Sequence, residues 1–222
     1  MQSLLNAEFK AIVFDMDNTL FDFYVCMEAG CRAVVDALGI GTPEELYAYY
    51  FRGIYSIEDN QNLLDFMRDH DCLSIDTLQA ISIFDDAKYR VLHPYSGIPE
   101  VLSTLKSEGY LLGLVTDAHT TSANVRLEKT NLVQYFDAIV GFDTTGYKKP
   151  HHAPFECVLD MLNCKPYEAM YIGDSLRRDV GPAEGVGMIA VHARYGFTGD
   201  YTFIPKLSVD SPHEILELLH SY

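Results

Sequence analysis

Four short apolar runs, each ending in an aspartate, place the strongest constraint on how this chain can fold. Runs of β-branched and aromatic residues of this length are typical of buried strands. They read KAIVFDMD (10–17), YLLGLVTD (110–117), AIVGFD (138–143) and AMYIGD (169–174), and a fifth run without the acid is MIAVHA (188–193). Helix-like stretches alternate with them, over 97–108, 121–130, 153–162 and 180–184. Short strands alternating with helices predict a parallel sheet covered by helices on both faces.

The interval from Phe21 to about Leu92 interrupts this alternation, because it carries helical signals and no clear strand. A helix start is indicated at 42–45, where threonine takes the N-cap, proline the first helical position and glutamate the third. Further helix-like stretches cover 58–68 and 77–90, and a closing helix covers 212–219. We therefore expect a three-layer, Rossmann-like α/β core from residues 1–20 and 93–222, with an inserted all-helical subdomain at 21–92.

The chain is strongly acidic, with 32 Asp and Glu against 16 Lys and Arg in 222 residues and a formal net charge of −16. Residues 21–92 alone hold 13 acidic and 5 basic side chains. An apolar fraction of 48% is enough to build a core, so the acidity does not indicate disorder. A surface this negative repels nucleic-acid phosphates and anionic lipids, so we expect neither a nucleic acid nor a membrane as a partner.

The amino-terminal sequence MQSLLNAEFK lacks the basic and apolar regions of a signal peptide, and no run approaches the roughly 18 apolar residues of a membrane span. We expect a soluble, cytoplasmic protein that is a monomer or a dimer. Five cysteines form no CxxC pair, which fits neither a disulfide framework nor a zinc site. We expect them to be reduced and mostly buried.

Several strands end in a residue that can serve chemistry, and ligands bind at the carboxyl ends of strands in an open parallel sheet. Asp15 and Asp17 follow the first strand, and such a carboxylate pair suits a hard cation. Asp174 follows another strand, after a glycine at 173 that would allow a tight turn. Each has an ordinary explanation when taken alone: solvated loop acids for the pair, and a helix N-cap for Asp174.

Two further strand ends add a hydroxyl and a cation. Thr116 stands beside Asp117, where its hydroxyl could bind an oxyanion, although an ordinary turn explains it as well. Lys148 and Lys149 precede Pro150, which favours an extended residue before it. Phosphoryl transfer through a covalent aspartyl-phosphate requires a set of groups that this chain supplies in order: a carboxylate pair, a hydroxyl, a lysine and a further acid.

The same segments resemble the four motifs of the haloacid dehalogenase (HAD) superfamily, in its phosphatase branch. They are FDMDNTL, VTDA, KKPHHAPF and YIGDSLRRDVGPAEGVGM, and the inserted subdomain matches the helical cap called C1. The resemblance implies that Asp15 is the nucleophile and Asp17 the general acid and base. It also implies that Thr116 binds the transferring phosphoryl group and that Lys149 neutralises its charge, with Lys148 as the fallback.

The resemblance implies a Mg²⁺ cofactor as well. Its ligands would be the Asp15 carboxylate, the main-chain carbonyl of Asp17 and Asp174. Supporting roles would fall to Asp179, as the second acid of the last motif, and to Ser175, which directly follows Asp174. Asp117, beside the motif threonine, is a further supporting residue.

Asp17 distinguishes branches within the superfamily, because the dehalogenases lack an acid at this position. The expected activity is therefore Mg²⁺-dependent hydrolysis of a small-molecule phosphomonoester through an aspartyl-phosphate. A phosphomutase on the same core is the alternative, although Asn18-Thr19 stands where many mutases and sugar phosphatases have glycine after the second aspartate. A non-catalytic binding module is the remote alternative.

The cap would then influence substrate choice. Arg52 is the cap cation of greatest interest, and Tyr24 follows the first motif closely. Tyr47, Tyr49, Tyr50, Phe51 and Tyr55 surround Arg52 in the sequence, and helical spacing favours core packing for most of them. His119 could line the pocket, while the adjacent His151 and His152 converge poorly on a metal and do not indicate zinc. The acidic field favours a small, singly phosphorylated substrate.

Overall fold

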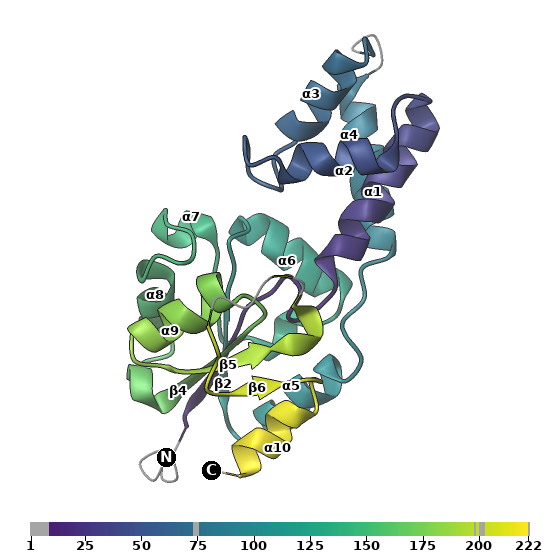
Figure 1. Cartoon of the computed structure of the whole chain (residues 1–222). Helices are drawn as coiled ribbons and strands as arrows, with labels where there is room; N and C mark the ends of the chain where they lie inside the picture. The colour runs from purple at the N-terminus through teal and green to yellow at the C-terminus, as the bar shows by residue number, and fades with distance from the viewer. Residues whose placement is uncertain (1–8, 73–75, 198, 200–202, 222) are drawn as a thin grey trace. The chain divides into compact units, whose positions relative to one another are not determined.

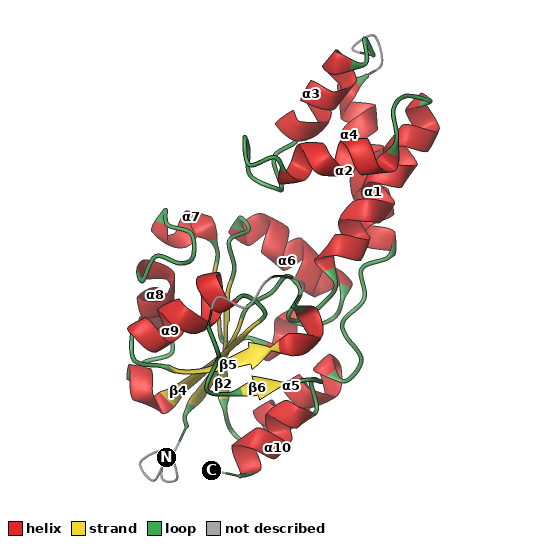
Figure 2. Cartoon of the chain, in the orientation of Figure 1, coloured by secondary structure: helices red, strands yellow, loops and turns green. Residues whose placement is uncertain are grey.

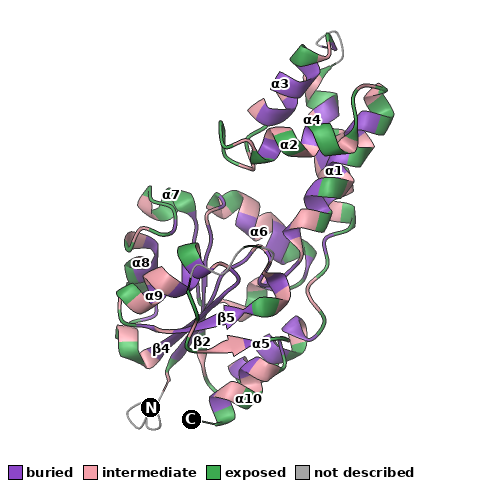
Figure 3. Cartoon of the chain, in the orientation of Figure 1, coloured by how far each residue is buried: buried purple, intermediate pink, exposed green. Residues whose placement is uncertain are grey.

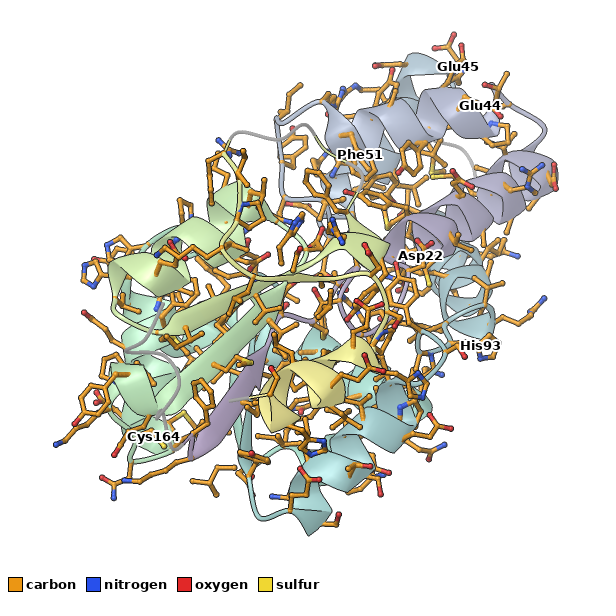
Figure 4. The ribbon with its side chains drawn as sticks, turned by 60° about the horizontal axis from the view of Figure 1, so that its bottom comes forward. Asp22, Glu44, Glu45, Phe51, His93 and Cys164 are labelled. Carbon is orange, nitrogen blue, oxygen red and sulfur yellow. The ribbon has the colours of Figure 1, made fainter. Side chains whose placement is uncertain are left out.

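The computed structural model describes residues 9–72, 76–197, 199 and 203–221, and its chain divides into two compact units. One unit comprises the residues up to Asp22 together with those from His93 onward, and the other comprises Phe23–Leu92. Figure 4 labels Asp22 and His93, the two points where the chain leaves the first unit and re-enters it.

The first unit is built on a parallel sheet, as the alternating pattern predicts. Its strands are β1 (Ala11–Phe14), β2 (Leu111–Val115), β3 (Ala138–Val140), β4 (Ala169–Gly173), β5 (Ile189–Ala193) and β6 (Ser208–Val209). They lie in the order β3-β2-β1-β4-β5-β6 and pair in parallel throughout. Figure 1 labels β2, β4, β5 and β6 of this sheet. The chain builds outward from β1 to β3 on one side and from β4 to β6 on the other. The point where the direction of winding reverses therefore lies between β1 and β4, where ligands bind in folds of this kind.

Helices cover both faces of the sheet (Figure 2). Val13 and Val115 face α8 (Ala153–Met161) and α9 (Gly181–Gly185) in one buried cluster. On the other face, α5 (Ile98–Ser107) contacts β2, and α10 (Glu214–His220) packs on α5. Most residues of the strands between these layers are buried, as Figure 3 shows, and β1 and β4 are buried throughout. The predicted three-layer α/β core is confirmed.

Two details of this unit differ from the sequence prediction. The run 138–143 is strand only as far as Val140, because the chain turns at Gly141 and starts the short helix α7 (Phe142–Thr145). The two-residue strand β6 was not predicted, since so short a segment has no measurable periodicity. The remaining elements of this unit are α6 (Thr120–Lys129) and the short turns η1 (Val133–Tyr135), η2 (Pro166–Glu168), η3 (Leu176–Val180) and η4 (Arg194–Gly196).

The second unit is helical over its described residues, with α1 (Phe23–Leu38), α2 (Pro43–Phe51), α3 (Gln61–Asp69) and α4 (Thr77–Arg90). The predicted capping box is present, since Glu45 N donates to Thr42 Oγ1 (3.2 Å) and Thr42 N donates to Glu45 Oε2 (2.8 Å). Figure 4 labels Glu44 and Glu45 at this start of α2 and Phe51 at its end. A core of its own, including Met27, Leu46 and Phe66, holds the four helices together.

The five cysteines are free thiols, of which Cys26, Cys31 and Cys72 are buried and the other two half-buried. Among the described residues, no helix is both long and apolar enough to cross a membrane.

Candidate active site

The strand order brings three of the predicted site residues to neighbouring strand ends. Asp15 follows β1, Thr116 follows β2 and Asp174 follows β4, and β1 lies between the other two. The ladder continues one residue past β1, where Asp15 N donates to the carbonyl of Ile172 (2.8 Å). All three residues are buried. Strand pairing alone therefore fixes where their backbones lie.

Lys149 joins these strand ends through its ammonium group. Its Nζ donates to Asp15 Oδ1, to Asp179 Oδ1 (2.6 Å), to the carbonyl of Val115 (3.3 Å) and to the hydroxyl of Tyr171 (3.3 Å). The side chain is 2% exposed. A buried ammonium among two carboxylates is a fixed positive charge at the point where the three strands end.

Lys148 lies differently from its neighbour. It is exposed, and its Nζ sits 5.2 Å from the ring centroid of Phe142. The structure thus brings the lysine immediately before Pro150, and not Lys148, into contact with Asp15.

Asp179 is held on every side by donors. Its Oδ1 accepts from Lys149 and from the Tyr171 hydroxyl (3.1 Å), and its Oδ2 accepts from Ser175 N (2.9 Å). It lies in η3, a single π-helical turn that Ser175 caps by accepting from Arg178 N (3.2 Å). Single π-helical turns are frequent at functional sites.

Gly173 does not form the tight turn that we expected, because it is the last residue of β4. It adopts ordinary strand geometry, and a Cβ at this position would lie 2.6 Å from the Cβ and Cγ of Asp179. The absence of a side chain at 173 therefore makes room for the Asp179 carboxylate beside Lys149.

The carboxylates of this cluster are costly to ionise together. Burial, reinforced by Asp179, raises the pKa of Asp15 to about 7 against the opposing effect of Lys149. Burial, together with Asp15 and Asp179, raises the pKa of Asp174 to about 9. Burial by itself would lower the pKa of Lys149, but Asp15 and Asp179 outweigh it and raise that pKa well above its ordinary value. The cluster therefore carries more negative charge than Lys149 offsets.

This arrangement fits a divalent cation. Oxygens of Asp15, Asp174 and Asp179 lie within 4.8 Å of one another, and the described residues contain no other such group of metal-binding side chains. Asp174 Oδ1 is buried and accepts no hydrogen bond in the described part of the chain, whereas both Asp179 oxygens are occupied. A buried carboxylate oxygen without a donor is what a missing hard cation would leave. The donor set therefore favours Asp15 and Asp174 as ligands over Asp179.

Asp17 lies outside this carboxylate group and is bound elsewhere. Its Oδ1 accepts from Arg126 Nη1 (2.6 Å), and its side chain is 25% exposed against 1% for Arg126. The main-chain carbonyl of Asp17 remains the ligand that the resemblance assigns, so its carboxylate need not join the metal group.

The remaining core residues of the prediction lie around Thr116. Thr116 Oγ1 accepts from Ala118 N (3.1 Å), which shapes the turn after β2. Asp117 accepts from the Lys149 main-chain N (2.8 Å) and from Arg178 Nη1 (3.3 Å). Asp117 thus connects the backbone at Lys149 to the turn after β2.

Three residues of the site were not found by sequence reasoning. Thr19 Oγ1 donates to Asp15 Oδ2 (3.3 Å) and accepts from Asp174 N (3.1 Å), so it links the two acids. Tyr171 lies inside β4, where an aromatic residue in an apolar run predicts only packing in the core. Arg126 is a charged residue on the buried face of α6, beside Ala123 and Leu127, and this break in the apolar pattern is a signal that could have revealed it.

The cap residues named from the sequence pack within the cap. The Arg52 guanidinium donates to Asp65 Oδ2 (2.5 Å) and lies 4.5 Å from the ring centroid of Tyr49 and 5.6 Å from that of Tyr55. Tyr24 lies 6.0 Å from the Phe51 ring, between centroids. Whether Arg52 or Tyr24 meets a substrate stays a prediction.

The other cap aromatics divide between the cap core and its surface. Tyr50 is buried and stacks on Phe84, with ring centroids 5.0 Å apart, as core packing predicts. Phe51 is 41% exposed and stacks on Tyr47, with centroids 4.4 Å apart.

The histidines near the motifs lie at the surface. His119 is the exposed N-cap of α6, where its Nδ1 accepts from Thr121 N (3.4 Å). His151 stacks between Tyr147 and His152.

A surface pocket exists at the opposite end of the strands. It is lined by Lys10, Leu159, Asp160, Asn163, Cys164, Lys165 and Glu168. Its residue Lys10 directly precedes β1, whereas Asp15 follows that strand at the other end. Figure 4 labels Cys164, another residue of this pocket. This pocket contains none of the predicted site residues.

The motifs, their order and the geometry above can be compared with known proteins. The family profile described as haloacid dehalogenase-like hydrolase matches residues 12–193, which is most of the chain. The chain belongs to the haloacid dehalogenase-like hydrolases. The resemblance seen in the four motifs is thereby confirmed, and the protein is a hydrolase.

Two HAD relatives of established name are similar over most of their length. A glyceraldehyde 3-phosphate phosphatase of Pyrococcus furiosus is 28% identical over 195 residues, covering 84% of this chain and 81% of the relative. A phosphoglycolate phosphatase of Aquifex aeolicus is 26% identical over 215 residues, covering 96% and 98%.

Among solved structures, a HAD hydrolase of Bacillus subtilis bound to magnesium superposes with a TM-score of 0.76. Its sequence identity is 18%, and the match covers 96% of this chain and 99% of the other. At this identity the likeness shows that the two chains share the HAD fold.

Proposed function

We propose that this HAD hydrolase is a Mg²⁺-dependent phosphatase that cleaves a small phosphomonoester through a phosphorylated Asp15. The observation that carries the proposal is the buried Asp174 Oδ1 without a donor, next to an Asp15 that Lys149 holds in place. A structural ion pair alone would leave no such oxygen, because buried acceptors are almost always paired.

In the first half of the reaction, an Asp15 oxygen attacks the phosphorus and the bond from phosphorus to the ester oxygen breaks. Lys149 fixes the Asp15 carboxylate and supplies positive charge beside the transferring group. The Thr116 hydroxyl donates to a phosphoryl oxygen. Asp17 gives its proton to the departing ester oxygen, which leaves as an alcohol.

In the second half, Asp17 is ionised and takes a proton from water. The resulting hydroxide attacks the phosphorus, the bond to Asp15 breaks, and inorganic phosphate leaves with Asp15 restored as a carboxylate. Asp17 thus begins and ends the cycle protonated, which balances the overall hydrolysis.

Asp15, Asp174 and the main-chain carbonyl of Asp17 would hold the Mg²⁺ ion. When bound, Mg²⁺ would offset the charge of these acids and of the phosphate ester.

The substrate we propose is a small, singly phosphorylated metabolite. The two relatives compared above are named for glyceraldehyde 3-phosphate and phosphoglycolate, which both fit this class, while a further relative is named for ribulose 1,5-bisphosphate. The net charge of −16 points the same way, because each further phosphate adds repulsion from the surface.

Phosphate release from 4-nitrophenyl phosphate, with Mg²⁺ and with EDTA, tests the reaction. We expect release that needs Mg²⁺ and that Asp15→Asn abolishes. Activity retained by Asp15→Asn would overturn the mechanism. A screen of small phosphate esters then identifies the substrate class, and isomer formation in place of phosphate release would show a phosphomutase.

A further inference from the structure

Arg126 is a buried arginine to which the mechanism above gives no part. Arg126 lies on α6 with 1% of its side chain exposed, and its Nη1 donates to Asp17 Oδ1 across 2.6 Å. The two residues are 109 positions apart in the chain. A partner carboxylate often recovers only part of the free energy that is lost when a guanidinium is buried. Stability alone therefore does not explain why the fold keeps this ion pair.

We propose that Arg126 is a positioning residue that holds the Asp17 carboxylate in the orientation needed for proton transfer to the leaving group. This proposal rests on the function proposed above, in which Asp17 is the acid and base. Asp17 lies on the loop after β1, and a carboxylate on a loop turns about two bonds unless something fixes it.

The contact ties the Asp17 carboxylate to a buried cation at one oxygen. Arg126 donates to Oδ1, while the Asp17 side chain is 25% exposed against 1% for Arg126. The carboxylate is therefore fixed against the protein interior and still partly exposed, as a group that exchanges protons must be.

The helix that carries Arg126 is itself anchored at the site. α6 begins four residues after Thr116, and its first residue, Thr120, donates through both N (2.7 Å) and Oγ1 (2.8 Å) to Asp143 Oδ1. One rigid element thus links the turn of the phosphoryl-binding hydroxyl to the orientation of the acid. Rigid support of this kind is what sub-ångström placement of a catalytic group requires.

The test compares phenyl phosphate with 4-nitrophenyl phosphate. The two esters have nearly the same shape, but phenol is the poorer leaving group and depends more on protonation. The ratio of kcat/KM for the two esters reports phosphoryl transfer to Asp15, and it does not depend on how much of a variant is folded. We expect Arg126→Met to lower kcat/KM about tenfold more on phenyl phosphate than on 4-nitrophenyl phosphate.

Three further variants define the outcome. Arg126→Lys should restore much of the ratio, because it keeps a charged donor. Lys129→Met, on the exposed face of α6, removes the same charge and should leave the ratio at the wild-type value. In an Asp17→Asn background, Arg126→Met should change the ratio no further.

An equal loss on both esters in Arg126→Met would overturn the proposal and leave Arg126 a structural residue. That result is distinguishable from failure of the proposed function, in which the wild type itself releases no phosphate or Asp15→Asn remains active.

Discussion

The backbone of Gly196 packs directly on the main-chain carbonyl of Asn18, so that a Cβ at position 196 would overlap the carbonyl oxygen. This contact joins the turn after β5 to the loop that carries Asp15 and Asp17. The neighbouring Tyr195 strengthens it, because its hydroxyl donates to the carbonyl of Thr19 (3.0 Å). The main-chain carbonyls of Asn18 and Thr19 are thus both contacted by the turn after β5.

Gly196→Ala should therefore displace the loop that carries the nucleophile. We expect kcat to fall at least tenfold and the free energy of unfolding to fall by about 2 kcal/mol, the cost of overpacking a close contact. Steady-state kinetics and urea denaturation measure the two effects. Gly185→Ala is the control, since a Cβ there meets nothing within 4 Å. Equal behaviour of the two variants would contradict the expectation.

Asn18 provides a second test of the same loop. Its φ of 63° lies in the left-handed region, which asparagine tolerates and glycine adopts freely. Asn18→Gly should stay within about 1 kcal/mol of the wild type, whereas Asn18→Ala should lose about 1–2 kcal/mol. Urea denaturation of the two variants decides, and an alanine variant as stable as the glycine variant would refute this explanation.

The same φ explains why the motif reads Asp-Asn-Thr where many mutases and sugar phosphatases have glycine. Both residue types accept this backbone conformation, so the φ at position 18 does not distinguish a mutase from a phosphatase.

Residues that lie at strand ends were predictable from the strand pattern, whereas Lys149, which follows α7 and not a strand, and Asp179 in η3 were found through the family motifs. Asp15, Thr116 and Asp174 each end an apolar run, so the strand pattern and the parallel sheet placed them at one edge. Thr19, Tyr171 and Arg126 contribute through side-chain contacts with distant partners. A break in the apolar pattern of α6 marks Arg126 as unusual, but no local pattern names the partners of these three residues, because the contacts depend on tertiary packing.

The helices show the same division. The capping box of α2 is a local signal, and it marked the start of that helix correctly. The 16-residue helix α1 was not delimited in advance, because it follows directly from the loop after β1 and its start carries no proline or capping box in the sequence. Its apolar face packs against α2 and α4, contacts that the sequence alone does not reveal.

The two adjacent lysines give a matched pair of variants. Lys149→Met removes the buried cation between Asp15 and Asp179, so we expect loss of activity and a loss of stability of about 3–5 kcal/mol. Lys148→Met changes an exposed side chain and should keep kcat within about twofold and stability within about 0.5 kcal/mol of the wild type. Phosphatase assays and thermal unfolding measure both. An active Lys149→Met would contradict the role given to Lys149, and the double variant with Lys148→Met would then test the neighbouring lysine.

Arg52→Ala tests the cap. Because Arg52 pairs with Asp65 and lies against two tyrosine rings, we expect the variant to lower Tm while KM for 4-nitrophenyl phosphate stays unchanged. Asp65→Ala should lower Tm as well, and the double variant should lose less than the sum of the two. A rise in KM confined to the natural substrate, with Tm unchanged, would instead show that Arg52 binds substrate.

The raised pKa values of Asp15 and Asp174 predict how pH and Mg²⁺ act on stability. In the metal-free protein the two acids keep their protons up to about pH 7 and 9, whereas unfolded aspartates lose theirs near pH 4. The folded state then binds more protons than the unfolded state, so the contribution of these groups to stability falls as pH rises through that window. Mg²⁺ binds the ionised carboxylates and offsets this loss. The increase in Tm on adding Mg²⁺ should therefore be larger at pH 8 than at pH 5.5.

Asp174→Asn separates this effect from other titrations. The amide keeps the shape of the side chain but has no charge to bury, so in EDTA at pH 8 we expect the variant to be more stable than the wild type by about 2 kcal/mol. It should also lose the Mg²⁺-dependent rise in Tm and the phosphatase activity. Asp160→Asn, an exposed aspartate of α8, is the control and should change none of these. A destabilised Asp174→Asn, or one that still responds to Mg²⁺, would mean that Asp174 Oδ1 is not the oxygen that the cation binds.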